Sequence, residues 1–144
     1  METTKEVLNQ VLVKIFNKII FNEENYLLKE VGSKITINGV HILQAIEEAG
    51  EQPSMKNIAE TLNITAGTLS VGLKRLIEGG YVTKTQSAAD KRIYLLALTP
   101  TGKKVCKIHS KYHQELIDTI TRNLSTKEEA ALVDLISKVK YFVS

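Results

Sequence analysis

The chain has 144 residues, of which 43% are hydrophobic and 24% charged, and its formal net charge at pH 7 is +3. This length suffices for one domain with a real core, and the small basic excess suits nucleic-acid binding without requiring it. The single cysteine excludes a disulfide framework, and no apolar run approaches the roughly 20 residues that a membrane span needs. The acidic, polar N-terminus also lacks a signal-peptide pattern, so we expect a cytoplasmic protein.

The N-terminal third predicts two helices. Residues 5–30 carry apolar side chains at helical spacing without a proline, namely Leu8, Leu12, Ile15, Phe16, Ile19 and Ile20. The segment 32–34 should end this first helix. A second helix should begin after Thr36 and end near Gly50, and its inward-facing residues should be Val40, Ile42, Leu43 and Ile46.

Residues 54–77 read as two short helices joined by a tight turn. Ser54 stands where an N-cap belongs, and a helix of about two turns should follow it. After the connection 63–65, Thr65 can cap a second helix whose apolar stripe consists of Leu69, Leu73, Leu76 and Ile77. Two such helices form a helix-turn-helix unit.

The opposite face of this second helix is short and cationic. It carries Gly67, Thr68, Val71, Lys74 and Arg75. An ordinary solvated face seldom contains glycine, whereas a flat face with hydroxyl, methyl and cationic groups can approach the major groove of DNA closely. Together with Thr65 and Ser70, these residues are candidates for DNA contacts. The alternative is an ordinary amphipathic helix with a small-residue outer face.

A β-hairpin should follow the second helix. Gly79 and Gly80 end the helix, and the runs 81–85 and 92–98 are rich in β-branched and aromatic residues around a turn-like segment, 87–91. Helix, turn, helix and hairpin together predict a winged helix-turn-helix.

The wing motif resembles that of the MarR family of transcription regulators. Asp90, Lys91 and Arg92, followed by Leu98 and Thr99, look like the family's D-x-R…L-T signature, and the stretch 73–82 resembles the exit of its recognition helix. The match of element order extends along nearly the whole chain, although the sharp motifs lie within 54–99. The resemblance implies that Arg92 enters a minor groove and that Asp90 holds its guanidinium. The alternative is a surface ion pair of little energetic consequence.

Two helices should complete the chain. Thr99 and Pro100 form a strong helix start, and this helix should run to about Asn123. Ser125 to Glu128 form a capping box before a last helix with apolar Leu132, Leu135, Ile136, Val139 and Phe142.

We therefore expect a mainly α-helical protein with a small β-hairpin wing and a single MarR-like domain, 1–144. Its DNA-binding block would be 36–99, and 1–32 and 100–144 would be dimerisation helices. A homodimer would bind a pseudo-palindromic operator in double-stranded DNA, as in the family. The alternative is that the terminal helices pack on each other within a monomer.

The resemblance implies two kinds of effector. In zinc-responsive members, positions similar to one of Glu23 and Glu24, and to His41, His109 and His113, bind zinc, which suits a tetrahedral shell. The second metal site of the zinc-responsive members has no match in this chain, because Val40 and Ile108 occupy positions where that site has acidic residues. The stretches 15–24 and 109–113 resemble instead the fatty-acid-biosynthesis repressors, which bind acylated acyl carrier protein. The alternative to metal binding is that the three histidines have only structural roles.

Other classes of function have weaker support. Ser110 follows His109, so the His-Glu-x-x-His pattern of zinc hydrolases is absent, and no enzyme is expected. Cys106 should be a buried small hydrophobe rather than a peroxide sensor. A winged helix used only for protein contacts remains an alternative, but the pairs Lys74–Arg75 and Lys91–Arg92 argue against it. We expect a repressor of fatty-acid synthesis that senses acylated carrier protein, ahead of a zinc-responsive regulator.

Overall fold

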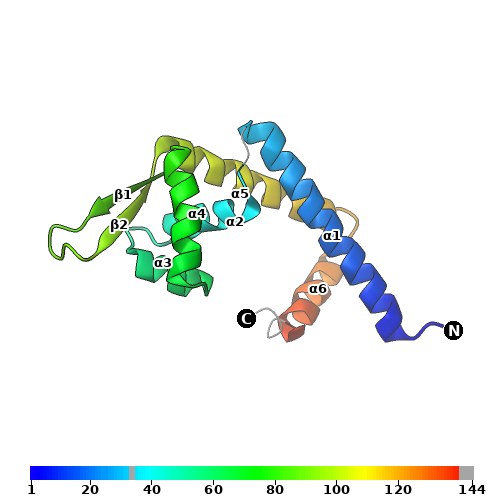
Figure 1. Cartoon of the computed structure of the whole chain (residues 1–144). Coiled ribbons are helices and arrows are strands. Elements are labelled where there is room, and N and C mark those ends of the chain that lie inside the picture. The colour runs from blue at the N-terminus through cyan, green and yellow to red at the C-terminus, as the bar shows by residue number, and fades with distance from the viewer. Residues whose placement is uncertain (33–34, 140–144) are drawn as a thin grey trace. The chain divides into compact units, whose positions relative to one another are not determined.

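The computed structural model describes residues 1–32 and 35–139, which form six helices and one β-hairpin (Figure 1). The chain divides into two compact units, residues 1–109 and the residues from 110 on. Each unit is described by itself. None of the described helices is long and apolar enough to cross a membrane.

The first helix, α1 (Thr4–Val31), has the predicted extent. A capping box of Thr3 and Glu6 begins it, and Gly32 ends it with a left-handed backbone (φ 71°). Only Glu23 and Leu27 are buried along its length, so its predicted apolar residues are exposed or half-buried within this one chain.

Three short helices form the compact block of the first unit. They are α2 (Ile37–Glu48), α3 (Met55–Leu62) and α4 (Ala66–Glu78). The predicted caps are confirmed, because the side chains of Thr36, Ser54 and Thr65 each accept a hydrogen bond from an amide three residues later. The fully buried centre of the block includes Val40, Leu43, Ile58, Leu69, Leu73 and Leu96.

The apolar stripe of α4 is narrower than the sequence pattern predicts. Leu69, Leu73 and Leu76 are buried, but Ile77 is 36% exposed. Ile77 lies at the edge of the stripe, one residue before the helix ends at Glu78.

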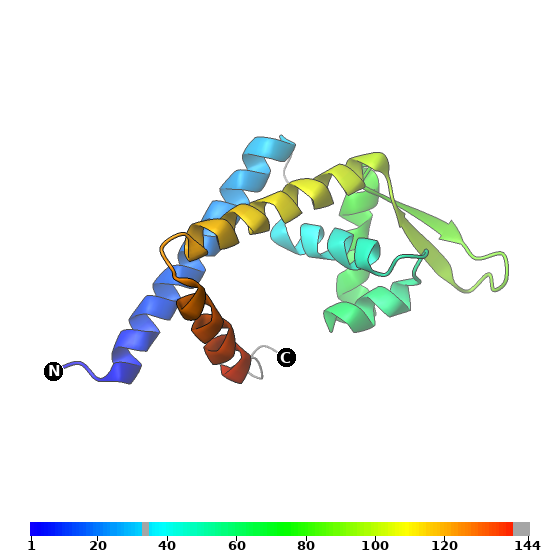
Figure 2. The same ribbon diagram turned by 180° about the vertical axis from the view of Figure 1, so that it is seen from behind.

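The wing consists of β1 (Val82–Gln86) and β2 (Tyr94–Leu98), paired antiparallel from Val82↔Leu98 to Gln86↔Tyr94. Each strand begins later than predicted. The amide of Tyr81 donates to Leu76 at the end of α4, and the amide of Arg92 donates to Asp90 in the turn, so neither joins the ladder. The hairpin projects beyond α3 and α4 at one end of the block (Figures 1 and 2).

The helix α5 (Pro100–Thr121) begins directly after Thr99, as predicted, and ends slightly before Asn123. In the second unit, Glu128 and Ser125 form the predicted capping box, and this hydrogen bonding lowers the pKa of Glu128. α6 (Thr126–Val139) follows, with Val133, Leu135, Ile136 and Val139 exposed. The predicted apolar residue Phe142 lies outside the described residues.

Candidate nucleic-acid interface

The exposed face of α4 carries the residues predicted to contact DNA. Burial of Leu69, Leu73 and Leu76 turns the opposite side of the helix to solvent. Six predicted DNA-contact residues on α4 are exposed there: Gly67, Thr68, Ser70, Val71, Lys74 and Arg75. Val71 is 60% exposed, so its methyl groups are available to a partner surface.

The start of α4 is fixed by a pair of threonines. The hydroxyl oxygen of Thr65 accepts from the amide of Thr68 (3.1 Å), and the same hydroxyl donates to the oxygen of Thr68 (2.9 Å). Both side chains are exposed. The cap therefore orders the first turn of the helix and presents the hydroxyl groups at the end that reads base edges or phosphates in helix-turn-helix proteins.

At the wing tip, Asp90 orders Arg92. Its Oδ1 accepts from the backbone amide (3.0 Å) and from Nε (3.1 Å) of Arg92, and its Oδ2 accepts from Nη2 (3.1 Å). These bonds lower the pKa of Asp90 and raise the pKa of Arg92. The Arg92 side chain is 91% exposed, so the edge of the guanidinium that Asp90 does not contact faces solvent.

Two further hydrogen bonds stiffen the wing turn. The hydroxyl of Ser87 accepts from the amide of Asp90 (3.3 Å), and the amide side chain of Gln86 donates to the carbonyl of Lys91 (2.7 Å). Lys91 is itself exposed beside Arg92. The tip therefore offers two cations on an ordered turn, as a groove of negative potential requires.

Lys84 belongs to the same surface, and sequence reasoning missed it. Its Nζ lies 4.6 Å from the centroid of the Tyr94 ring on the paired strand, a cation–π contact that keeps the long side chain over the wing. Alternation along β1 places Lys84 on the same face as buried Val82, so the sequence pattern did not indicate its exposure, and its pairing with Tyr94 depends on the register of the hairpin.

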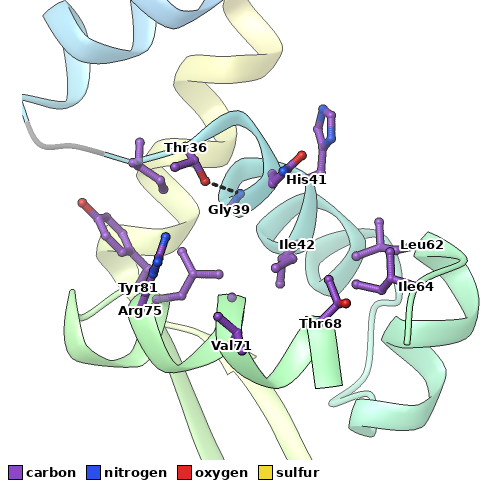
Figure 3. Close-up of a pocket in the computed structure, with 14 residues that line it drawn as sticks. Thr36, Gly39, His41, Ile42, Leu62, Ile64, Thr68, Val71, Arg75 and Tyr81 are labelled. Carbon is purple, nitrogen blue, oxygen red and sulfur yellow. Dashed lines mark hydrogen bonds between the residues drawn. The ribbon is translucent and has the colours of Figure 1, made fainter. Parts of the chain in front are cut away.

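A pocket of about 510 Å³ is lined by residues of α2 and α4 (Figure 3). Its apolar lining comes from both helices and the turn before α4, including Ile42, Leu62, Ile64, Val71 and Leu76. The polar groups at its rim include Asn38, His41, Thr68 and Arg75.

His109 is at the centre of a buried polar cluster. Its Nε2 contacts Oε1 of buried Glu23, and its Nδ1 lies 2.7 Å from Nε2 of Gln44. The arrangement is consistent with a neutral ring that donates through Nε2 to the carboxylate and accepts at Nδ1 from the amide. Gln44 was not predicted, although it stands three residues after His41 on α2.

Within the first unit, the structure brings together two of the predicted metal ligands, Glu23 and His109. The His41 ring centroid lies 6.3 Å from that of His109, whereas Glu24 is exposed and Glu23 is the glutamate at the cluster. His113 belongs to the second unit, where its ring packs edge-on against Tyr112. Imidazole and carboxylate suit zinc, but protein groups already engage both ring nitrogens of His109. Among the described residues, no buried side-chain nitrogen or oxygen lacks a hydrogen-bond partner.

Cys106 is buried, as predicted. Burial and the nearby carboxylate of Glu47, to which the thiol donates, raise its pKa to about 12. Because the thiolate is the reactive form, this thiol is unreactive at neutral pH.

These features define a winged helix-turn-helix DNA-binding protein: a capped helix with a cationic outer face, and a hairpin with an ordered arginine at its tip. The chain belongs to the MarR family of transcription regulators, whose family model matches residues 34–93.

Similar proteins support this assignment. The chain is 33% identical over 106 residues to the helix-turn-helix transcriptional regulator YhjH of Bacillus subtilis, a match that covers 72% of this chain and 58% of YhjH. It therefore spans less than two thirds of that relative. It is 30% identical to the transcriptional regulator SarZ of Staphylococcus epidermidis, over 85% of this chain and 80% of SarZ. Streptococcus pneumoniae FabT, solved in complex with DNA, matches with a TM-score of 0.84 and 25% identity over 96% of both chains.

Proposed function

We propose that this regulator represses transcription as a homodimer on a pseudo-palindromic operator. The observation that carries the proposal is the combination, on one block, of the cationic face of α4 and the guanidinium that Asp90 orders at the wing tip. A single block of this kind covers one half-site, and a two-fold dimer is the usual way to cover two.

The exposed apolar side chains of α1 support the dimer. Leu8, Leu12, Ile15 and Phe16 share one helical stripe and are 45–57% exposed in this chain. A stripe of this kind is costly to leave in water, and contiguous exposed apolar surface marks interfaces. We propose that the same stripe of a second copy covers it.

The proposed effector is acylated acyl carrier protein, with fatty-acid synthesis as the regulated process. The resemblance of 15–24 and 109–113 to the fatty-acid-biosynthesis repressors supports this proposal. The pocket between α2 and α4 also supports it, because its volume and apolar lining suit a hydrocarbon chain. An acyl chain there would pack between α2 and the recognition helix α4. It would therefore change the free energy of the α4 position that binds DNA relative to other positions.

Zinc is the alternative effector. Two observations favour zinc: Glu23 contacts His109, and the ring of His41 lies near that of His109. The engagement of both His109 nitrogens by protein groups favours the structural role instead. The two proposals differ in their response to chelation, because zinc regulation requires bound metal and lipid regulation does not.

The test begins with a duplex selected by the full chain from a random-sequence library. Titration of this duplex with protein should show specific binding by a dimer and affinity that falls steeply with salt. Acylated carrier protein should change that affinity, while the unacylated carrier and a chelator should not. If selection yields no sequence, specific repression is wrong, and if only chelation changes affinity, zinc replaces the acyl chain as effector.

The pocket can be tested separately. Asn38 is exposed at the rim, so Asn38→Phe should fill the pocket without disturbing the core. We expect this variant to keep its affinity for the selected duplex and to lose the response to acylated carrier protein. Glu48→Phe, at the far end of α2, is the matched control and should respond normally. A normal response from Asn38→Phe would place the acyl chain elsewhere.

A further inference from the structure

The exit of α4 leaves two backbone carbonyls to be satisfied from elsewhere. After Gly79, Gly80 takes a left-handed conformation (φ 80°), and the amide of Tyr81 returns to the carbonyl of Leu76 (2.9 Å). This is the glycine-dependent helix ending in which amide groups turn back toward the last turn. The carbonyls of Gly80 and Tyr81 therefore lie outside the helix.

Thr99 binds both carbonyls. Its hydroxyl donates to the carbonyl of Gly80 (2.6 Å), and its amide donates to the carbonyl of Tyr81 (3.0 Å). The same hydroxyl oxygen accepts from the amide of Gly102 (3.1 Å), as the N-cap of α5. One side chain thus joins the end of the recognition helix to the first turn of the next helix.

Gly102 makes this approach sterically possible. A Cβ atom at position 102 would collide with the carbonyl oxygen of Tyr81 and lie 3.2 Å from its carbonyl carbon. Both are backbone atoms, so no side-chain rotation relieves the contact. Inside a helix alanine is favoured over glycine by about 1 kcal/mol, so close approach is the reason for glycine here.

This contact, which we call the Thr99 junction (Gly80, Tyr81, Thr99 and Gly102), is also the root of the wing. The cross-strand pair Val82↔Leu98 is adjacent to it in both strands, because Val82 follows Tyr81 and Leu98 precedes Thr99. The junction therefore fixes the direction in which the hairpin leaves α4. A protein that places a helix in one groove and an arginine in the next needs this angle to be set before it binds.

We propose that Thr99 and Gly102 are positioning residues for sequence-specific DNA binding, which hold α4 and the wing at the angle at which both engage DNA. This inference rests on the proposed mode of DNA binding, and it assigns no DNA contact to either residue. A positioning role differs from a purely structural one in its effect on specificity. Loss of the angle weakens binding to the correct sequence and leaves the phosphate-directed attraction intact.

The test compares two duplexes, one selected by the wild-type chain from a random library and a scrambled one of the same composition. Thr99→Val removes one hydroxyl and keeps the branched shape, and Gly102→Ala forces the junction apart. Both variants should lose about tenfold or more in affinity for the selected duplex, comparable to a mismatched base pair. Their affinity for the scrambled duplex and the salt dependence of binding should remain those of the wild type.

Thr99→Ser should restore specific binding, because serine keeps the hydroxyl. Thr121→Val is the matched control, since it removes a hydroxyl that bonds only within its own helix, to Ile117 (2.8 Å). If Gly102→Ala does not fold, Thr99→Val decides the question. Unchanged specific affinity, or equal losses on both duplexes, would overturn the proposal. A wild-type chain that does not distinguish the two duplexes would overturn the proposed function instead.

Discussion

The carboxylate of Asp90 holds one edge of the Arg92 guanidinium through Nε and Nη2, both at 3.1 Å. The pair is exposed to water, so it contributes little to folding stability. Its consequence is directional, because the hydrogen bonds restrict a long side chain to one orientation at the tip of the wing. The pKa of Asp90 is lowered below its ordinary 3.8, so the pair stays charged throughout the neutral and mildly acidic range.

Arg92→Ala should therefore reduce specific DNA affinity by about 10- to 100-fold, the range for loss of a good groove contact, without affecting the fold. Asp90→Asn should produce a smaller loss, because it keeps the cation and removes only its orientation. Fluorescence anisotropy with the selected duplex measures both. Arg122→Ala, an exposed arginine of the second unit, is the control and should bind normally. Wild-type affinity in Arg92→Ala would contradict the role of the wing.

Lys74 should contact phosphate rather than bases. Lys74→Ala should weaken selected and scrambled duplexes alike, and it should reduce the slope of log affinity against log salt by about 0.9 if one phosphate contact is lost. Titrations at several salt concentrations measure this slope. Lys127→Ala on α6 removes the same charge elsewhere and controls for net charge. A loss confined to the selected duplex would show that Lys74 reads a base.

Much of the fold could be predicted because local signals agreed with one another. The caps at Thr36, Ser54 and Thr65, the helical spacing of Leu69 and Leu73, and Thr99 before Pro100 each act within a few residues. The wing signature was recognisable for the same reason, since Asp90 and Arg92 are two residues apart. Strand starts were less accurate, because Tyr81 and Arg92 have β-type side chains but make hydrogen bonds that belong to turns.

The site features that sequence reasoning missed depend on distant pairs. Gln44 contacts His109, which is 65 residues away in the sequence. Lys84 makes its cation–π contact with Tyr94 only in the observed register of the hairpin. The pocket is lined in part by Gly72 of α4, where Ile42 of α2 packs so closely that a Cβ atom on the glycine would lie 2.7 Å from its Cδ1. Composition and periodicity carry no information about which buried positions are filled.

The apolar stripe of α1 should be needed for the dimer. Leu12→Glu combined with Phe16→Glu places two charges on the stripe, and we expect monomers or aggregates in sedimentation velocity together with weak operator binding. Gln10→Glu combined with Asn17→Glu adds the same charge to the opposite side of the helix and should leave the assembly unchanged. A well-behaved dimer from the stripe variant would locate the interface elsewhere.

Cys106 should be inert and should make stability depend on pH in the alkaline range. The pKa of its thiol is raised from 9.0 to about 12, so the folded state favours the protonated form. This contribution to stability is complete below pH 9 and is lost as the pH rises toward 12. Urea unfolding between pH 8 and 11 should show a decline that Cys106→Ala reduces, and iodoacetamide should not label the folded wild type at pH 8. Rapid labelling there would contradict a buried, protonated thiol.

The last prediction separates a structural His109 from a zinc ligand, and His41 is the residue that discriminates. His109→Ala removes a buried partner of Glu23 and Gln44, so it should lower the free energy of unfolding by about 1–3 kcal/mol under either model.

His41 is exposed, and its ring lies 6.3 Å from that of His109. His41→Ala should therefore cost little stability and leave DNA affinity unchanged if the cluster is structural. If the cluster binds zinc, His41→Ala should lower zinc affinity by orders of magnitude, and operator binding should depend on chelator and weaken at acidic pH, where protons compete for imidazole. Unfolding titrations, metal titrations and operator binding with and without chelator, on both variants and the wild type, measure these effects. We expect the structural outcome, because both nitrogens of His109 already contact protein groups.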